Sequence, residues 1–166
     1  MTESDDRLHV VDPMEVMRRL ERTTHWGGRF SAGEAVAHIV QECLLGRAAT
    51  VSVRHVSDWW VVGADVDWLA QDGDVAFRRI VSYPEAGSNS MRYEVALAAF
   101  AEDVLTAFDG AVTRIKGECR SFPFSTDDVR ELGRRVVAFR SNNSSNGDEV
   151  SGAGGAGPRG TMRPTT

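Results

Sequence analysis

The sequence predicts an α+β fold, a two-layer sandwich in which helices pack on one face of a mostly antiparallel sheet. Apolar residues recur at helical spacing in several segments, and two short strands are separated by a tight turn. Strands and helices do not alternate strictly along the chain, which favours α+β over α/β architecture. The chain has 166 residues, of which 42% are hydrophobic, enough for one domain with a real core. We expect a single globular domain over residues 7–140.

Two helices are expected at the start of this domain. Asp12, Pro13 and Glu15 form a helix-start pattern, and the helix should run to about residue 22. Ser31 and Glu34 form a second capping pattern, and the helix that follows should end at Gly46. Residues 23–30 should form the loop between the two helices.

Three strands are expected next. Residues 50–56 alternate between apolar and polar types, and residues 59–64 are rich in aromatic and β-branched side chains. The short turn at residues 57–58 would join them in a hairpin. Residues 75–81 are the third expected strand. Because Trp59 and Trp60 are adjacent, they must face opposite sides of the sheet. One can enter the core, whereas the other needs the C-terminal helix, a ligand or another protein.

The second half of the domain is expected to contain two more helices and one more strand. Residues 83–90 form a loop by composition, and a long helix should follow over residues 91–108. Residues 111–116 are the fourth expected strand. Residues 126–139 should form the last helix, capped by Ser125 or Thr126. Residues 141–166 are rich in Gly, Ser and Asn, with one Val and one Met, and are expected to be a disordered tail.

Composition narrows the class of protein. The net charge is −5, which argues against nucleic acid as the main partner. The sequence shows no secretory signal and no long apolar run, so no membrane association is expected. Cys43 and Cys119 do not form a Cys-x-x-Cys pair, and we expect two reduced cysteines in a cytoplasmic protein.

Several local segments occur in an order that suggests a family. Residues 17–28 read MRRLERTTHWGG, and residues 38–46 read HIVQECLLG. Residues 61–69 read VVGADVDWL, and residues 84–90 read PEAGSNS. These segments, over residues 11–117, resemble the ATP-binding domain of the DNA gyrase B subunit and its GHKL relatives. The corresponding family patterns are R-x-R-P-G-M-Y-I-G, H-x-x-x-E-x-x-D-N, D-D-G-R-G and a glycine-rich lid.

The resemblance implies roles for a few residues. It places Glu42 at the family's general base, Asp65 or Asp67 at the Asp that accepts the adenine amino hydrogen, and Gly87 in the lid. The family's magnesium-binding Asn corresponds to Gly46, and Gly87 is the only glycine of the lid segment. Triphosphate binding needs a dense set of backbone N–H donors and a cation. The resemblance therefore implies a degenerate domain that does not hydrolyse ATP, with ATP and magnesium as the only cofactors it suggests.

The candidate residues also have structural explanations. Glu42 could be an exposed or capped helical glutamate, and its spacing from His38 could give a surface pair or two metal ligands. Asp65 and Asp67 could be paired carboxylates on one side of a strand, or capping residues of a turn. Residues 88–90 could bind an anion at a helix N-terminus, or simply cap that helix.

Three functions follow from these observations. The first is a non-catalytic or weakly nucleotide-binding, gyrase-B-like domain that acts mainly through protein–protein interaction, with an unidentified partner or with itself, through its sheet and exposed tryptophans. The second is an ATP-binding domain of the GHKL type, in which Glu42 and an aspartate line one pocket. The third is an unrelated small regulatory or immunity-type binding protein. No motif identifies a reaction, so we expect no enzyme.

Overall fold

The computed structural model describes residues 12–23, 30–119 and 125–141. Within these ranges the chain forms an open five-stranded sheet with helices packed against it, so the predicted α+β fold is confirmed. The elements are α1 Pro13–Thr23, α2 Ala32–Leu45, β1 Val51–Val56, β2 Trp59–Ala64, the 3-10 turns η1 Gly73–Phe77 and η2 Pro84–Ala86, α3 Glu94–Phe100, β3 Asp103–Phe108, β4 Ala111–Lys116, α4 Thr126–Leu132 and β5 Arg135–Arg140.

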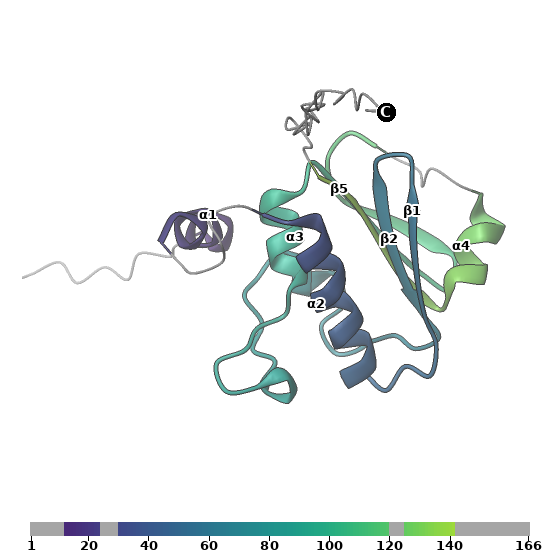
Figure 1. The fold of residues 1–166 in the computed structure, drawn as a ribbon, viewed down its shortest axis with the longest axis horizontal. Helices are drawn as coiled ribbons and strands as arrows, with labels where there is room; N and C mark the ends of the chain where they lie inside the picture. The colour runs from purple at the N-terminus through teal and green to yellow at the C-terminus, as the bar shows by residue number, and fades with distance from the viewer. Residues whose placement is uncertain (1–11, 24–29, 120–124, 142–166) are drawn as a thin grey trace, which may run out of the picture.

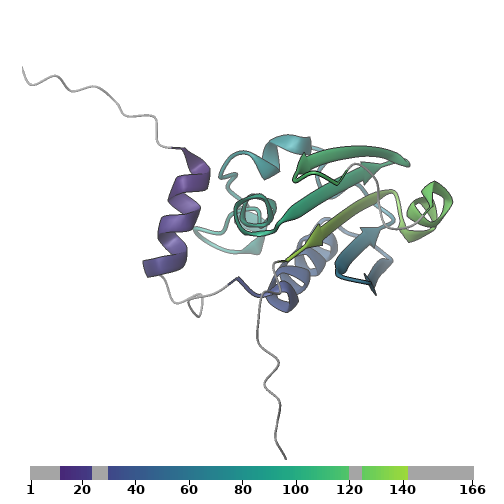
Figure 2. The same cartoon turned by 90° about the horizontal axis from the view of Figure 1, so that it is seen from above.

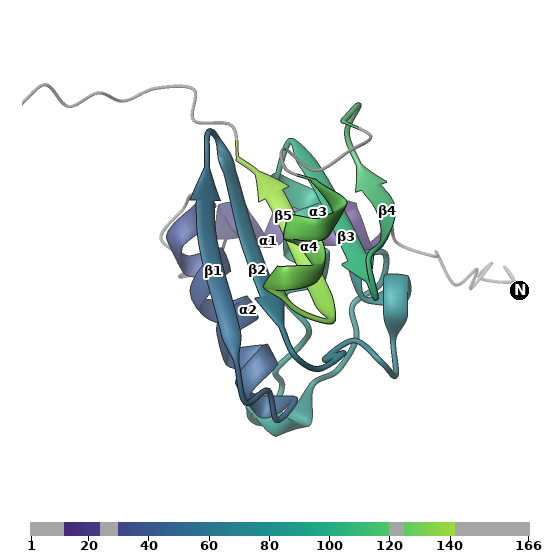
Figure 3. The same cartoon turned by 90° about the vertical axis from the view of Figure 1, so that its right-hand side faces the viewer.

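The sheet has the order β1-β2-β5-β3-β4, and every neighbouring pair of strands is antiparallel. The helices α2 and α3 lie on one face of this sheet, and α1 packs beside α3 (Figure 1, Figure 2). The short helix α4 lies on the opposite face, over β2 and β5 (Figure 3). The sandwich therefore has one main helical layer and a single short helix behind the sheet.

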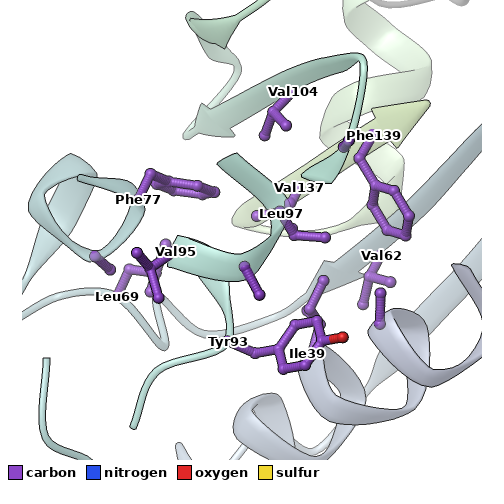
Figure 4. Close-up of a cluster of buried hydrophobic side chains, with 14 of the residues drawn as sticks. Ile39, Val62, Leu69, Phe77, Tyr93, Val95, Leu97, Val104, Val137 and Phe139 are labelled. Carbon is purple, nitrogen blue, oxygen red and sulfur yellow. The ribbon is translucent and has the colours of Figure 1, made fainter. Parts of the chain in front are cut away.

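The main core lies between the sheet and the helical layer. Figure 4 shows Leu97 of α3 among side chains from the sheet, including Val137 and Phe139, with Ile39 of α2 below. A smaller cluster lies on the other face, where Trp59 packs with Val129 and Leu132 of α4. Burial of these apolar side chains supplies most of the favourable free energy of folding.

The structure confirms the predicted starts and stops of the first elements. The Asp12 carboxylate accepts a hydrogen bond from the Met14 backbone N–H at 2.9 Å, and Pro13 is the first residue of α1. The Ser31 hydroxyl accepts one from Glu34 N–H at 3.4 Å, and Gly46 caps α2. The predicted hairpin is also present, as β1 and β2.

The strand predicted over residues 75–81 is wrong. These residues begin in η1, and Val75 and Ile80 are largely exposed, at 46% and 44%. The hydrogen bonds around Val75 are local, such as Arg78 N–H to the Val75 carbonyl at 2.9 Å, and only Val81 at the end accepts a long-range bond, from Arg92 N–H at 2.9 Å. The nearest ladder contact is an isolated bridge between Ser82 and Met91. An apolar run without a neighbouring strand to pair with cannot join a sheet.

The two helices predicted over residues 91–108 and 126–139 are each half helix and half strand. The first is α3 followed by β3, because Ala101 adopts an extended conformation with ψ 155°. The second is α4 followed by β5, because Gly133 has a φ of +145° and its backbone approaches Ala64 closely. The fourth predicted strand, residues 111–116, is confirmed as β4.

Some predictions lie outside the described residues. These are the ends of the predicted domain at residues 7–11, most of the loop over residues 23–30 with Trp26, and the tail over residues 142–166. No helix in the described part of the chain is long and apolar enough to span a membrane.

Candidate functional site

Glu42 is the predicted site residue that lies deepest in the molecule, inside a polar network with Arg92. It occupies the third turn of α2, on the face that packs against the chain before α3, and is only 4% exposed. The Tyr93 backbone N–H donates a hydrogen bond to its Oε1 at 2.6 Å, and Arg92 Nη1 donates one to its Oε2 at 3.2 Å. The interpretation of Glu42 as an exposed helical glutamate is therefore wrong.

Arg92 joins this carboxylate to the loop after β2. Its Nε donates a hydrogen bond to Asp72 Oδ2 at 3.1 Å, and its guanidinium lies 4.0 Å from the centre of the Tyr83 ring. The Arg92 side chain is 6% exposed, so this charge is largely removed from water. Two carboxylates and an aromatic face hold it in place, which is the environment a buried guanidinium needs.

Glu94 is the second buried carboxyl group of the network. It is 0% exposed, and its Oε1 accepts a hydrogen bond from the Trp68 indole Nε1–H at 2.9 Å. Its Oε2 is buried and has no hydrogen-bond donor among the described residues. A buried oxygen without a donor is costly, which indicates that a proton is shared nearby.

The charges in this network shift several pKa values. Burial and then the adjacent Glu94 raise the pKa of Glu42 to about 8. Burial, with Glu94 and Glu42 next in importance, raises the pKa of the Cys43 thiol strongly. Burial also raises the pKa of Tyr93 to about 12. Cys43 therefore stays a neutral thiol, which is not the reactive thiolate form.

A pocket of about 380 Å³ lies against this network, between the C-terminal end of α2, the loop after β2 and the segment around η2. We call it the Trp68 pocket. Arg92, Trp68 and Tyr83 form part of its wall and also belong to the network. The described residues that line it are Leu45, Gly46, Asp67, Trp68, Ala70, Gln71, Asp72, Ser82, Tyr83, Pro84, Glu85 and Arg92.

Gly46 is required for this pocket to form. A Cβ atom at residue 46 would lie 2.9 Å from the Trp68 Cβ and 3.2 Å from the Glu42 carbonyl oxygen. The loop after β2 therefore packs directly against the end of α2, with no space for a side chain. Residue 46 is the position that the gyrase resemblance assigns to a magnesium-binding Asn, and here any side chain would displace Trp68.

The two predicted aspartates serve different parts of the fold. Both follow the end of β2 at Ala64, so the prediction that they share one side of a strand is wrong. Asp65 is exposed and accepts hydrogen bonds from the backbone N–H groups of Ala49 and Thr50, at 3.1 and 3.2 Å. It therefore ties the start of β1 to the end of β2.

Asp67 is the predicted aspartate that reaches the pocket. Its carboxylate accepts hydrogen bonds from Arg135 Nε at 2.7 Å and Nη2 at 3.1 Å, and caps the turn at Leu69 N–H at 3.2 Å. Gly87 lies in the loop after η2 with a φ of +128° and does not line the pocket. Of the four predicted residues, one lines the pocket and Glu42 lies next to it through Arg92.

The remaining candidates are explained by packing. His38 is exposed and stacks on Tyr93 with ring centres 4.5 Å apart. Among the described residues no group of three or more His, Cys, Asp or Glu could hold a metal ion. Residues 88–90 do not cap a helix, since α3 begins only at Glu94.

The tryptophans are less exposed than the first hypothesis requires. Trp59 and Trp68 are 5% and 3% exposed, and Trp60 is half-buried beside His55. Trp59 and Trp60 do face opposite sides of the sheet, as predicted, and Trp59 finds its partner in α4. Trp59 and Trp68 are therefore too buried to form an exposed interaction surface, and of the three tryptophans in the described residues Trp60 alone is partly exposed.

Sequence reasoning missed the residues that build the network around Glu42. Asp72, Arg92 and Glu94 do not stand out in the sequence, and Trp68 does so only as one of the tryptophans of the first hypothesis. The signal was the RYE triplet over residues 92–94, charged on both sides of Tyr93 and directly before the apolar run VALAAF. Charged residues at the start of a buried helix indicate partners that a sequence pattern alone does not identify.

Comparisons of the chain with protein-family models, with curated proteins and with solved structures find no match. The site therefore has to be interpreted from its own geometry.

Proposed function

We propose that this chain is a non-catalytic binding domain that acts through protein–protein interaction, and that the Trp68 pocket receives a basic side chain of the partner. The charge of the pocket carries the proposal. Its described lining contains three carboxylates, on Asp67, Asp72 and Glu85, and one cation, Arg92. Arg92 is already held by Glu42 and Asp72, and Asp67 is paired with Arg135, so the carboxylate of Glu85 is the charge of the lining that has no ion-pair partner among the described residues and favours a cation.

Nucleotide binding is the competing hypothesis, and the same charges weigh against it. A triphosphate in this pocket would approach Asp67, Asp72 and Glu85. The only guanidinium among the described lining residues is engaged by two carboxylates, and Gly46 leaves no side chain to hold magnesium. The gyrase-like resemblance stays a hypothesis about ancestry, and a domain of that kind without ATP chemistry agrees with the proposed role.

A partner protein fits the pocket better than a free metabolite does. Leu45 at the end of α2 lines the pocket and is 37% exposed, and Leu44, which precedes it in the chain, is 59% exposed. Apolar surface next to a polar pocket is typical of interfaces in which one buried side chain is surrounded by apolar contacts. Lysine or arginine of the partner would enter the pocket while its neighbours cover the two leucines.

The test uses a minimal probe in place of the partner. The ¹⁵N-labelled full chain is titrated with N-acetyl-arginine amide, and the Trp68 indole N–H signal is followed by NMR. We expect saturable shifts of this signal and of backbone signals over residues 70–72 and 82–85. Neutral N-acetyl-citrulline amide, of nearly the same shape, should bind much more weakly.

A variant of the pocket and a matched control sharpen the result. Glu85→Gln removes an exposed carboxylate from the lining. It should lower the affinity for N-acetyl-arginine amide about two- to fivefold, the range expected for one solvent-exposed charge. Glu131→Gln removes an exposed carboxylate from α4, on the opposite face, and should have no effect. Equal shifts with citrulline, or shifts of the same signals with ATP and magnesium but not with arginine, would overturn the proposal.

A further inference from the structure

The carboxyl groups of Glu42 and Glu94 form a buried pair beneath the pocket. Glu42 and Glu94 are 4% and 0% exposed, and the hydrogen bond from Tyr93 N–H to Glu42 Oε1 brings the Glu42 carboxyl to the residue that precedes Glu94. An ionised carboxylate contains acceptors only, so a carboxyl oxygen that is buried without a donor calls for a proton. Glu94 Oε2 is such an oxygen among the described residues.

The surroundings of the pair allow one proton but do not neutralise both charges. Arg92 is the cation that contacts it, and Arg92 is shared with Asp72. The Tyr93 N–H and the Trp68 indole each donate one hydrogen bond, which supports one negative charge on the pair. Two close carboxylates in a buried site cannot both ionise near neutral pH. The other titratable groups that interact with the pair or with Arg92 are Cys43 and Tyr83, and Glu85 acts in turn on Tyr83.

The pair and the pocket share two residues. Trp68 lines the pocket and donates to Glu94, and Arg92 lines the pocket and donates to Glu42. A positive charge in the pocket therefore acts on the pair from just behind these two side chains. A nearby cation favours the ionised form of a carboxyl group.

We propose that the Glu42–Glu94 pair is a proton-binding site coupled to the Trp68 pocket, so that entry of a guanidinium or ammonium group expels the shared proton to solvent. The inference rests on the proposed function, because it assumes a cationic occupant. The balance is simple: one cation enters, one proton leaves, and the net charge of the site is unchanged. The domain would then bind its partner more tightly as the pH rises.

The first measurement needs no variant and no ligand. Carboxyl ¹³C chemical shifts of Glu42 and Glu94 in the full chain are followed from pH 5 to 9. We expect one of the two carboxyls to remain protonated at pH 6 and to lose its proton near pH 8. Two carboxyls that are both ionised at pH 6 would overturn the inference, whatever the pocket binds.

The second measurement counts the protons released on binding. Calorimetric titrations with N-acetyl-arginine amide are repeated in buffers of different ionisation enthalpy, and the slope gives the number of protons. We expect close to one proton released at pH 7, and an affinity that rises by up to about tenfold per pH unit, reaching a plateau above about pH 8. Binding without proton release would overturn the coupling and leave the proposed function standing.

Variants separate the coupling from the fold. Glu94→Gln keeps the size of the side chain, and its amide can donate to Glu42, so the shared proton is no longer needed. Proton release should fall to near zero in this variant while the arginine probe still binds, and the Glu131→Gln control should release the proton as the natural chain does. If the carboxyls titrate as expected but arginine binds to no variant, both the coupling and the proposed function fail.

Discussion

The buried ion pair between Asp67 and Arg135 links the loop after β2 to the start of β5. Its two side chains are 13% and 7% exposed, and two hydrogen bonds of 2.7 and 3.1 Å join them. Arg135 also donates to the Thr106 hydroxyl at 3.4 Å and lies 4.9 Å from the centre of the Phe108 ring. The pair therefore holds three segments together and fixes one wall of the Trp68 pocket.

Removing one partner of this pair should destabilise the domain strongly. Arg135→Met leaves the Asp67 carboxylate largely buried without its cation, and we expect a loss of about 3 kcal/mol in the free energy of unfolding. Urea denaturation followed by tryptophan fluorescence measures it. Arg134→Met is the matched control, because its pair with Asp109 is exposed on both sides at 55% and should cost less than about 1 kcal/mol. Equal losses in the two variants would contradict a structural role for burial of the pair.

Individual residues show how far the sequence could predict the site. Glu42 was a candidate because it stands at the family's general base in the gyrase resemblance, and the sequence did not predict that it is buried. The roles of Glu94 and Arg92 could not be predicted, because they depend on contact between the end of α2 and the start of α3. Arg92 and Glu42, which form an ion pair there, are 50 residues apart in the sequence. Asp67 was a candidate because the resemblance places it at the adenine-binding Asp, whereas in the structure it pairs with Arg135. Long-range polar partners are set by tertiary packing, which one sequence does not encode locally.

At the level of elements, α4 depends on a glycine in the strand that it covers. A Cβ atom at Gly63 of β2 would lie 2.4 Å from the Leu132 carbonyl oxygen and 2.9 Å from its carbon. This close approach lets Leu132 and Val129 pack on Trp59 in the smaller core. The absence of a side chain at Gly63 thus determines how closely α4 can approach the sheet.

Adding one methyl group here should loosen α4. Gly63→Ala forces the end of α4 outward, and we expect a loss of about 1–3 kcal/mol, the usual cost of overpacking. The Trp59 emission should shift to longer wavelength as water reaches the smaller core, and urea denaturation gives the change in free energy. Gly33→Ala is the control: its Cβ meets only Ser31 Oγ at 3.9 Å, and alanine favours α2 by up to about 1 kcal/mol. A neutral Gly63→Ala would show that α4 is not seated as described.

The elements that sequence analysis assigned wrongly have a common physical cause. The strands β3 and β5 are central in the sheet and buried on both faces, so their sequences DVLTAF and RVVAFR lack a clear alternation. Each follows a short helix directly, and the combined apolar segment looks like one long helix. The hairpin of β1 and β2 was predicted correctly because its turn is local and β1 lies at an edge.

For the whole molecule, charge sets how stability depends on pH. Asp103 lies at the junction of β3 and β5. Burial alone would raise its pKa, but the hydrogen bonds from Cys119 N–H and Arg140 together have the larger effect, so its pKa is lowered. Its contribution to stability is therefore present above its ordinary pKa of 3.8 and is lost in more acid solution. The buried Glu42–Glu94 pair acts in the opposite direction and at higher pH.

The pair should make the domain less stable as the solution becomes more alkaline. Because the pKa of Glu42 is raised from 4.5 in the unfolded chain to about 8 in the fold, the folded state binds more protons than the unfolded state between these values. The stabilisation is full below about pH 4.5 and is lost as the pH rises through about 8. The free energy of unfolding should fall over this range by at most about 1.4 kcal/mol per pH unit.

Urea denaturation at pH 5.5, 6.5, 7.5 and 8.5 measures this slope. In Glu94→Gln the slope should become shallow, because the amide stabilises the ionised Glu42 and removes the need for a shared proton. Glu131→Gln changes the net charge by the same amount on the exposed surface of α4, and its slope should match that of the natural chain. The net charge of the chain, −5 at pH 7, changes little between pH 7.5 and 8.5. A decrease in the free energy of unfolding over that interval can therefore be assigned to the buried pair. A free energy of unfolding that stays constant or rises with pH would mean that both carboxyls are ionised in the folded molecule.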